Sequence, residues 1–470
     1  MRTRPTATRV IRTVIGVAGV AAAVATVLVA GRLDVPPIGA APASVTVTPV
    51  AAAQSRVCAG PLVEVGGDAA AATAVSSVGA PVVAAGDGLD VPAELSAVAV
   101  PDDVASGPGP SVLTAPPAED GTALAGSQAQ SVAGERLAGF AASACVEATP
   151  ESWLVGGSTD VGQSTVILLT NPTDVEANVS IEVFGENGPV EAPGASGIVV
   201  APTSQRIVPL AGIAPNLQIP AIHVTSVGAP VAASLQQSAV RAITPEGLDV
   251  IGATTAPGVE HVIPGFTVPA SRPADGVTGY DYRVPGVRVL APGTFDSEVT
   301  ITATPVGGTA SEPRIATVPA GSVVEVPLDD LAPGDYSLTV TADVPVVAAA
   351  HAATTTDEAT DFAWFAAAGT LDDGATVAVA GDQGAGAILY LVNTGAEDRT
   401  ARIVGPQGER SFVVAGGGSP KPVGGIAGIS VLSGVEGLAA AVVYPGASEF
   451  ASFVLAPPGA ASDPVVVRTR

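Results

Sequence analysis

The sequence is poor in positive charge. Lys421 is the only lysine, and 19 lysines and arginines stand against 44 aspartates and glutamates, which gives a formal net charge of -25. Proteins that bind nucleic acid neutralise phosphates with clustered lysines and arginines. The charge balance therefore argues against a nucleic-acid partner. An acidic balance of this kind is typical of a protein that stays soluble outside the cell.

Aromatic residues and histidines are also scarce, with two tryptophans, five tyrosines and three histidines in 470 residues. Glycosidases need two acids facing a cleft lined by rings on which sugars stack, and few rings are available here. The histidines His223, His261 and His351 lie far apart, and we expect them to be ordinary surface or edge residues, with His261 in a linker. The segment DDLAPGD at 329–335 lacks the alternating acids of a dedicated calcium loop.

The usual catalytic motifs are missing as well. The sequence has no G-x-S-x-G elbow, no H-E-x-x-H motif, no Walker loop and no G-x-G-x-x-G after a strand. We therefore predict no catalytic residues, no cofactor-binding residues and no metal ligands, and we expect that the protein is not an enzyme.

Cysteine is limited to Cys58 and Cys145. Two cysteines this far apart supply too few ligands for a metal site. An even count in an exported chain favours a disulfide between them. Closing a loop of that length would stabilise the fold by about 4–5 kcal/mol on the chain-entropy model.

The N-terminus has the pattern of an export segment. Four arginines within residues 2–12 precede an apolar run from Val14 to Ala30. Positive residues before such a run keep its N-terminus in the cytoplasm. As a helix, a run of 17 residues is about 25 Å long, which is slightly short for a membrane span and long for a signal-peptide core. A retained single-span anchor and a signal cleaved after Gly31 both fit, and either would export everything that follows.

The rest of the chain has the pattern of short strands. Glycine (55) and proline (42) make up about a fifth of the residues, which favours strands joined by many turns. The segment 168–188, LLTNPTDVEANVSIEVFGENG, alternates apolar and polar residues over 179–183, as a half-buried strand does. Similar phrases recur at 289–308 and 390–409. Three copies of one β unit are therefore expected.

Around each phrase we count seven short apolar runs separated by turn residues, which is typical of immunoglobulin-like or fibronectin-like sandwiches. A β-propeller would need more numerous and shorter repeats, of about 45 residues. The predicted fold is all-β, with three consecutive immunoglobulin/fibronectin-like β-sandwich domains after an N-terminal transmembrane or signal helix. The expected segments are a signal-anchor helix at 1–31, a flexible stalk at 32–55, a first sandwich at 56–245 with a largely irregular Ala/Gly/Pro-rich insertion at about 67–127, a second at 260–352, a third at 361–457 and a tail at 458–470.

Several pieces recur in the same order along these units. They are an aromatic beside small residues (Trp153 to Ser158), a strand ending in Asn171-Pro172, the turn from Val200 to Ser204 and the stretch from Val224 to Ala232. The third unit repeats them in part at Trp364 to Thr370 and Asn393 to Gly395, whereas the second lacks the tryptophan and has Ala291 in place of the asparagine.

In this order the pieces resemble the exported actinobacterial family known as domain of unknown function 5719. The segment Cys58-Ala-Gly-Pro, paired with a cysteine just before Trp153, also resembles that family. The resemblance covers most of residues 56–456. It implies exported β-sandwich repeats, and it supplies no catalytic residues because the family has no assigned activity.

Trp153 and Trp364 occupy equivalent places in the first and third predicted units, and we expect each to anchor a sandwich core. The sequence favours a structural or protein-interaction role in the cell envelope, reached through the N-terminal membrane helix or after secretion. The alternative is an envelope glycan-binding module, which would use exposed aromatics such as Tyr280 or Tyr282. The partner is then an unknown envelope protein or a glycan.

Overall fold

The computed structural model describes residues 44–47, 53–66, 74–86, 93–116, 124–271, 281–357, 359–381, 386–446, 449–455 and 465–468. The chain forms two units, Val50–Ser462 and a smaller one made of Met1–Pro49 with Asp463–Arg470. In the smaller unit, β1 (Ser44–Val47) pairs antiparallel with β34 (Val465–Arg468). The predicted helix at 1–31 lies outside the described residues. Within the part that is described, no helix reaches the length and apolarity needed to cross a membrane.

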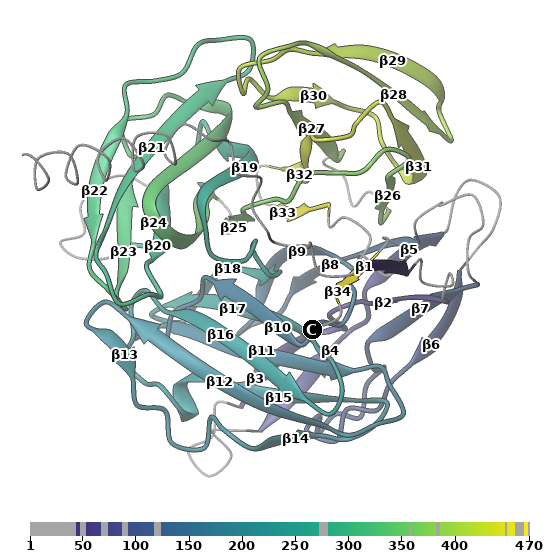
Figure 1. Cartoon of the computed structure of the whole chain (residues 1–470). Helices are drawn as coiled ribbons and strands as arrows, with labels where there is room; N and C mark the ends of the chain where they lie inside the picture. The colour runs from purple at the N-terminus through teal and green to yellow at the C-terminus, as the bar shows by residue number, and fades with distance from the viewer. Residues whose placement is uncertain are drawn as a thin grey trace, which may run out of the picture. The chain divides into compact units, whose positions relative to one another are not determined.

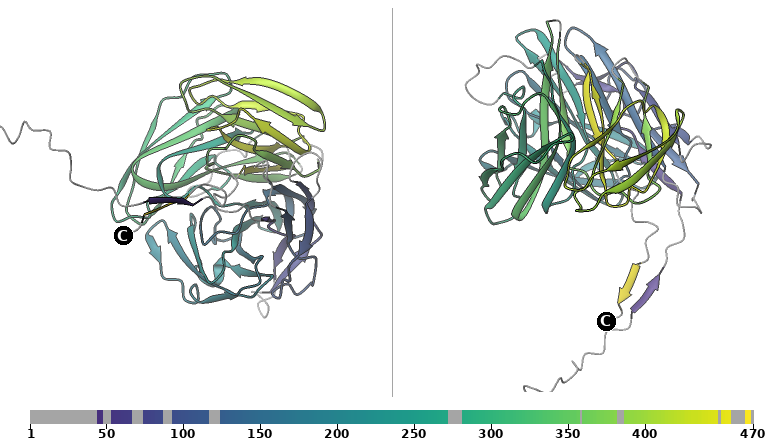
Figure 2. Two further views of the ribbon diagram at one scale, coloured as in Figure 1. Left: turned by 45° about the vertical axis from the view of Figure 1, so that its right-hand side comes forward. Right: turned by 90° about the horizontal axis from the view of Figure 1, so that it is seen from above.

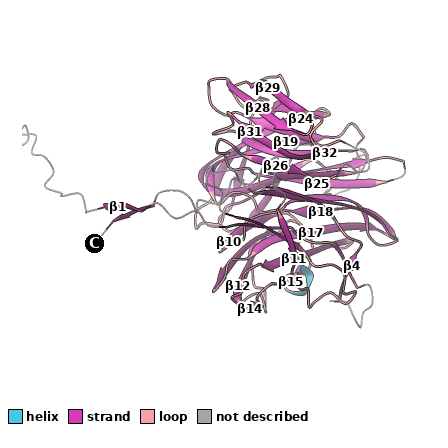
Figure 3. Ribbon diagram, turned by 90° about the vertical axis from the view of Figure 1, so that its right-hand side faces the viewer, coloured by secondary structure: helices cyan, strands magenta, loops and turns pink. Residues whose placement is uncertain are grey.

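Strands dominate the larger unit, as Figure 3 shows. The only helix among the described residues is a short 3-10 turn, η1 (Leu210–Gly212). The prediction of an all-β fold is therefore confirmed. The strands form several antiparallel sheets, which we group into four lobes by residue range: lobe 1 (54–144), lobe 2 (151–251), lobe 3 (258–366) and lobe 4 (376–454).

Lobe 2 consists of two sheets that enclose one apolar core. The first has the order β10-β16-β12-β13, with β14 also on β12, and the second has the order β15-β11-β17-β18. Along β12 the alternation expected from the sequence holds, because Val179, Ile181 and Val183 are buried while Glu182 is exposed. The strands of lobe 2 are β10 (Glu151–Val155), β11 (Gln163–Asn171), β12 (Ala177–Gly185), β13 (Gly188–Val190), β14 (Ile198–Val200), β15 (Ser204–Pro209), β16 (Ala221–Val227), β17 (Ala232–Arg241) and β18 (Thr244–Ile251).

Lobes 3 and 4 repeat this strand order. Lobe 3 has β22-β21-β24-β19 and β23-β20-β24-β25, with the long strand β24 passing from one sheet into the other. Lobe 4 has β26-β31-β28-β29 and β30-β27-β32-β33. Lobe 3 contains β19 (Gly258–Val268), β20 (Gly286–Leu290), β21 (Ser297–Pro305), β22 (Arg314–Val318), β23 (Val323–Pro327), β24 (Gly334–Thr355) and β25 (Thr360–Ala366). Lobe 4 contains β26 (Thr376–Val379), β27 (Ile388–Val392), β28 (Arg399–Gly405), β29 (Gly408–Val414), β30 (Lys421–Val423), β31 (Gly428–Ser433), β32 (Ala439–Pro445) and β33 (Phe450–Val454).

The recurring phrase marks the same place in each of these lobes, namely the end of β11, β20 and β27. Asn171 and Asn393 make the same turn there. Each side-chain amide donates to the carbonyl four residues on, at 2.7 Å and 2.8 Å. Each side-chain oxygen accepts the N–H two residues on, that of Thr173 or of Gly395. The sequence repeat is thus a repeat of local structure.

Lobe 1 differs from the sequence prediction. We expected a mostly irregular insertion over 67–127, but the described residues there include strands β4 to β7 and the start of β8, joined in the sheets β2-β7-β6, β3-β4 and β5-β8-β9. The strands are short and built mainly from Val, Ala and Ser, so no long apolar alternation marks them in the sequence. They are β2 (Gln54–Val57), β3 (Leu62–Val65), β4 (Val75–Val78), β5 (Val82–Gly86), β6 (Glu94–Ala97), β7 (Ser111–Ala115), β8 (Ala125–Ala133) and β9 (Ala138–Ala144).

The connecting pieces also differ from expectation. Residues 246–259, which lie between the first and second predicted sandwiches, carry most of β18 and the start of β19. β25, which the sequence analysis assigned to the third unit, pairs with β24 of lobe 3. Both strands are apolar enough to extend a sheet, and pattern alone does not say which neighbour they join.

The last strand of each lobe lies in the interior of the larger unit. β9 contacts β18, β18 contacts β25, β25 contacts β33, and β33 contacts β9 again. Figure 1 shows these four strands next to one another, and Figure 2 gives two further views of the chain. We call them the inner strands. The buried polar groups described next are arranged around them.

Candidate functional site

The inner strands meet at one buried carboxylate, that of Asp361 at the start of β25. Its Oδ2 accepts the N–H of Phe140 at 3.1 Å and that of Phe450 at 3.0 Å. Its Oδ1 accepts the N–H of Leu248 at 3.2 Å and that of Phe362 at 3.1 Å. Four backbone donors, one from the inner strand of each lobe, therefore converge on a single side chain.

Two glycines make room for this carboxylate. A Cβ at Gly139 would stand 2.8 Å from Asp361 Oδ1, and one at Gly247 would stand 2.7 Å from the same atom. Gly247 also has a φ of 102°, a backbone conformation that favours glycine. The two residues come directly before Phe140 and Leu248, so the inner strands of lobes 1 and 2 approach closely enough to donate.

A second buried carboxylate, Asp249 on β18, lies close to the first. It accepts the N–H of Trp364 at 2.7 Å and that of Val250 at 2.8 Å. Burial raises the pKa of both Asp249 and Asp361 well above the usual value, while the backbone donors act in the opposite direction. The negative charge of Asp361 raises the pKa of Asp249 further.

A different group of charges lies between lobes 2 and 3. Arg288 on β20 is fully buried and directly opposite Glu325 on β23, to whose Oε2 its Nε donates at 2.9 Å. Its Nη1 donates to the carbonyls of Gly157 at 2.8 Å and Pro220 at 3.0 Å. Its guanidinium also lies 4.6 Å from the centroid of the Trp364 ring.

Histidine completes this second group. His351 Nδ1 donates to the carbonyl of Tyr282 at 3.0 Å, and its Nε2 contacts the second oxygen of Glu325. Burial alone would raise the pKa of Glu325, but the positive charges of His351 and Arg288 and their hydrogen bonds lower it to about 2. Glu325 is therefore ionised at neutral pH. We call Arg288, Glu325 and His351 the Glu325 cluster.

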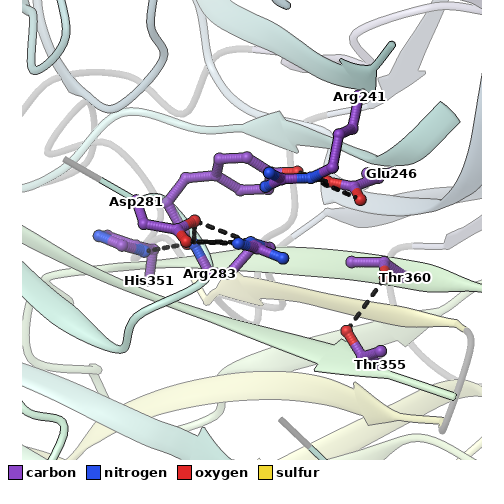
Figure 4. Close-up of polar contacts among 8 residues, drawn as sticks. Arg241, Glu246, Asp281, Arg283, His351, Thr355 and Thr360 are labelled. Carbon is purple, nitrogen blue, oxygen red and sulfur yellow. Dashed lines mark hydrogen bonds and ion pairs between the residues drawn. The ribbon is translucent and has the colours of Figure 1, made fainter. Parts of the chain in front are cut away.

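Further ion pairs lie beside His351 of the Glu325 cluster, and Figure 4 draws them. The guanidinium of Arg283 donates to Asp281 at 2.6 Å. Tyr282 donates its hydroxyl to Glu246 of lobe 2 at 2.6 Å, and Arg241 donates to both oxygens of Glu246 at 2.9 Å. Burial and the hydrogen bond to Glu246 raise the pKa of Tyr282, so its hydroxyl stays protonated.

A pocket of about 430 Å³ borders this network, lined by Ile219, Asp281, Val284, Pro285, Gly286, Val323, Val324, Glu325 and Pro327. These residues include no hydroxyl, thiol, lysine or histidine side chain. The two carboxylates among them are already paired with Arg283, Arg288 and His351. The geometry thus suits joining lobes 2 and 3 better than proton transfer.

The histidines are not the surface residues that the sequence suggested. His351 is 1% exposed, and His261 is 3% exposed on β19 rather than in a linker. His261 hydrogen-bonds to the hydroxyl of Thr255 at 2.8 Å and to the carbonyl of Val346 at 2.7 Å, and burial lowers its pKa. His223 is more accessible. It stacks on Trp153 with ring centroids 3.9 Å apart and lies between Glu151 and Glu182.

The two tryptophans are both buried but not equivalent. Trp153 lies on β10, the first strand of lobe 2, and Trp364 lies on β25, the last strand of lobe 3. Both belong to the same apolar core cluster. The short aromatic runs around them look alike in sequence, but they belong to different strands of the lobes.

Other residues singled out from the sequence are placed as follows. Cys58 and Cys145 form a disulfide. Asp330 of the DDLAPGD segment pairs with Arg314. Among the described residues, no group of three or more His, Cys, Asp or Glu could hold a metal ion. Tyr282 is buried rather than exposed, and Tyr280 lies outside the described residues.

Sequence reasoning missed Asp249, Asp361, Arg288 and Glu325. The available indication was a charge inside a short apolar run, as in LDVI, TDFAWF, VRVL and VVEV. Alternation alone predicts that such charges lie on the solvent face of a strand, whereas in this fold a neighbouring lobe covers that face.

Comparison with known proteins gives one family. A family model described as "Family of unknown function (DUF5719)" matches residues 98–414, well over half of the chain. No curated protein sequence matches. Similar solved structures include Thermotoga maritima 1070, at 14% identity over 24% of this chain and 95% of that chain, with a TM-score of 0.21. They also include the Anabaena sensory rhodopsin transducer, at 24% identity over 20% of this chain and 93% of that chain, with a TM-score of 0.16. The two structures carry no argument at these scores, but the family match confirms the resemblance inferred from the sequence: the chain belongs to the family of unknown function DUF5719.

Proposed function

We propose that the protein is a non-catalytic protein of the cell envelope, either tethered to the membrane or secreted, with a structural or protein-interaction role. Its arginine-led apolar N-terminal run and its Cys58–Cys145 disulfide support an exported location, because disulfides persist in oxidising compartments. The net charge of -25 supports solubility there.

We further infer that the lobes are immunoglobulin- or fibronectin-like sandwiches. Lobes 2, 3 and 4 support this, since each has two antiparallel sheets with the same strand order around an apolar core. Lobe 1 is smaller, and it would be a fourth and reduced member of the set rather than an insertion. The buried charges between lobes would make such an array stiff.

One surface carries the proposal of a protein-interaction role. Val175, Val199 and Val227 of lobe 2 are 52%, 44% and 76% exposed. Asn178 on β12 pairs with Val199 on one side and Val227 on the other, so the two valines flank it on the same sheet. Gly228, next to Val227, packs against the carbonyl of Glu176, next to Val175. We call Val175, Val199 and Val227 the valine patch.

Single exposed valines are common on protein surfaces, whereas larger exposed apolar patches mark interaction sites. Val199 and Val227 lie on one sheet, and Val175 lies in the turn before β12. The valine patch combines apolar side chains with an exposed asparagine that can hydrogen-bond a partner. A protein partner with a complementary apolar face would bury it. A glycan would find no aromatic ring in the patch on which to stack.

The test is capture of partners from envelope extracts by the full exported portion. We expect a defined protein to be retained, and retention to fall when Val199→Lys and Val227→Lys are combined. The matched control is Val413→Lys on β29, a residue that is also 52% exposed but lies in lobe 4. Retention of glycan alone, or of the same proteins by the patch variant, would contradict the proposal.

A further inference from the structure

A second pocket lies where the inner strands end. Its volume is about 320 Å³, and its wall comes from residues 143–149 at and beyond the end of β9, 251–255 at and beyond the end of β18, 364–369 around the end of β25 and 452–455 around the end of β33. All four lobes therefore contribute to it. We call it the inner-strand pocket, and it is separate from the pocket beside the Glu325 cluster and from the valine patch.

The wall of the inner-strand pocket is mostly apolar. Trp364, Phe453 and Leu455 supply its large side chains, together with Ile251 and several alanines. These large side chains are themselves buried in the protein. Pockets of this size and character bind small molecules that are largely hydrophobic, with a few polar groups fixing their orientation.

Arg56 is the one cationic residue in this wall, and its charge is poorly compensated. The residue is 5% exposed. Its Nε donates to the carbonyl of Leu124 at 3.2 Å, and its Nη1 lies 3.9 Å from Glu147, whose own side chain is 43% exposed. Burial lowers the pKa of Arg56. A guanidinium has five N–H donors, and these contacts use only part of them.

A second polar group in the wall of this pocket lacks a partner. Ser143 lines the inner-strand pocket and is 4% exposed, and its Oγ makes no hydrogen bond within the described residues. Buried polar groups without partners are uncommon and costly. A buried arginine with spare donors and a buried hydroxyl without a partner, in one apolar pocket, together indicate a missing ligand group.

We propose that the inner-strand pocket binds a small monocarboxylate with an apolar tail, such as a medium-chain fatty acid. The carboxylate would pair with Arg56, because a guanidinium matches a carboxylate in geometry and charge. The tail would pack against Trp364, Phe453 and Leu455. One negative charge suits the site better than a phosphate dianion, since Arg56 is the only cation in the wall and Glu147 would repel a second charge.

The test uses tryptophan fluorescence. Trp153 and Trp364 are the only tryptophans, so Trp153→Phe leaves Trp364 as the only reporter. We expect decanoate to change its emission saturably, with a Kd about tenfold or more below that of decanol, because the charged pairing is absent with the alcohol. Equal Kd values for decanoate and decanol, or decyl phosphate binding as tightly as decanoate, would overturn the proposal.

Two variants separate the pocket from general surface binding. Gly252 lines the pocket, and a Cβ there meets nothing within 4 Å, so Gly252→Phe can fill the space without strain at that atom. We expect this variant to lose decanoate binding while keeping its thermal unfolding curve. Arg56→Gln should bring the Kd of decanoate to that of decanol. Unchanged binding in Gly252→Phe would overturn the assignment even if Arg56→Gln fails to fold.

Discussion

The molecule buries charge between its lobes in two different ways. Asp361 is surrounded by backbone N–H groups from all four inner strands and has no cation among these partners. Glu325 is held by the side chains of Arg288 and His351. Both arrangements hold lobes together, but the first uses oriented peptide dipoles and the second uses counter-charges. The difference teaches that two acids held between lobes, Asp361 fully buried and Glu325 partly buried, can respond to pH in opposite directions.

The largest expected effect comes from the peptide-held acid. Asp361→Asn places an NH₂ group against two of the four N–H donors, and leaving two buried donors unsatisfied should lower the free energy of unfolding by about 5 kcal/mol. Chemical denaturation would measure this loss. Asp372→Asn, at an exposed position, is the control and should change stability very little. A loss as small in Asp361→Asn as in the control would remove the distinction between the two sites.

The cation-held acid should respond next most strongly. Arg288→Met leaves Glu325 buried with only one cationic partner, and breaking a buried pair in this way should cost about 4 kcal/mol. The control is Arg402→Met, which breaks the exposed pair with Glu409, where both side chains are about half exposed. That variant should lose less than about 1 kcal/mol. Similar losses in both variants would show that burial is not the deciding factor.

The two acids should also make the stability of the protein depend on pH in different ways. The pKa of Glu325 falls from 4.5 to about 2, so the folded state binds fewer protons than the unfolded state between these values. The resulting contribution of about 3 kcal/mol is present above pH 4.5 and is lost as the pH falls toward 2. Denaturation at a series of pH values should show this slope in the wild type and a weaker slope in Glu325→Gln.

Asp361 and Asp249 should act in the opposite sense. Their folded pKa values lie above 3.8, so the folded state binds more protons, and their contribution to stability decreases as the pH rises from about 4 toward the raised values. If the stability of Glu325→Gln still fell by the full wild-type amount between pH 4.5 and pH 2, the assignment of that loss to Glu325 would be contradicted.

A smaller effect should come from the glycines around Asp361. Gly247→Ala introduces a Cβ 2.7 Å from Asp361 Oδ1 at a φ of 102°, which should cost about 2 kcal/mol through strain. Gly212→Ala, where a Cβ meets nothing within 4 Å, is the matched control. Chemical denaturation would measure the difference. Equal denaturation midpoints for the two variants would mean that the close approach of the inner strands at Gly247 does not contribute to stability.

The sequence predicted those parts of the fold that depend on local pattern. Alternation along 179–183 gave the buried face of β12, and the repeated Asn171 and Asn393 marked equivalent turns. It did not reveal lobe 1, because a strand such as Ala125–Ala133 is built from small and polar residues and pairs with a segment far away in the chain, Val82–Gly86.

The sequence did not reveal the buried charges, for a related reason. A polar residue in an alternating strand is assumed to face water, and only the arrangement of lobes shows that Arg288 and Asp361 face another part of the chain. The same holds for His351, whose predicted surface position became a buried ion pair.

Amide hydrogen exchange tests most directly whether Asp361 joins the four lobes. In the wild type, the amides of Phe140, Leu248 and Phe450 should exchange slowly because each donates to that carboxylate. In Asp361→Asn, protection should fall together in three segments far apart in the chain, 138–144, 244–251 and 450–454. Loss of protection confined to residues 360–366 would contradict the account.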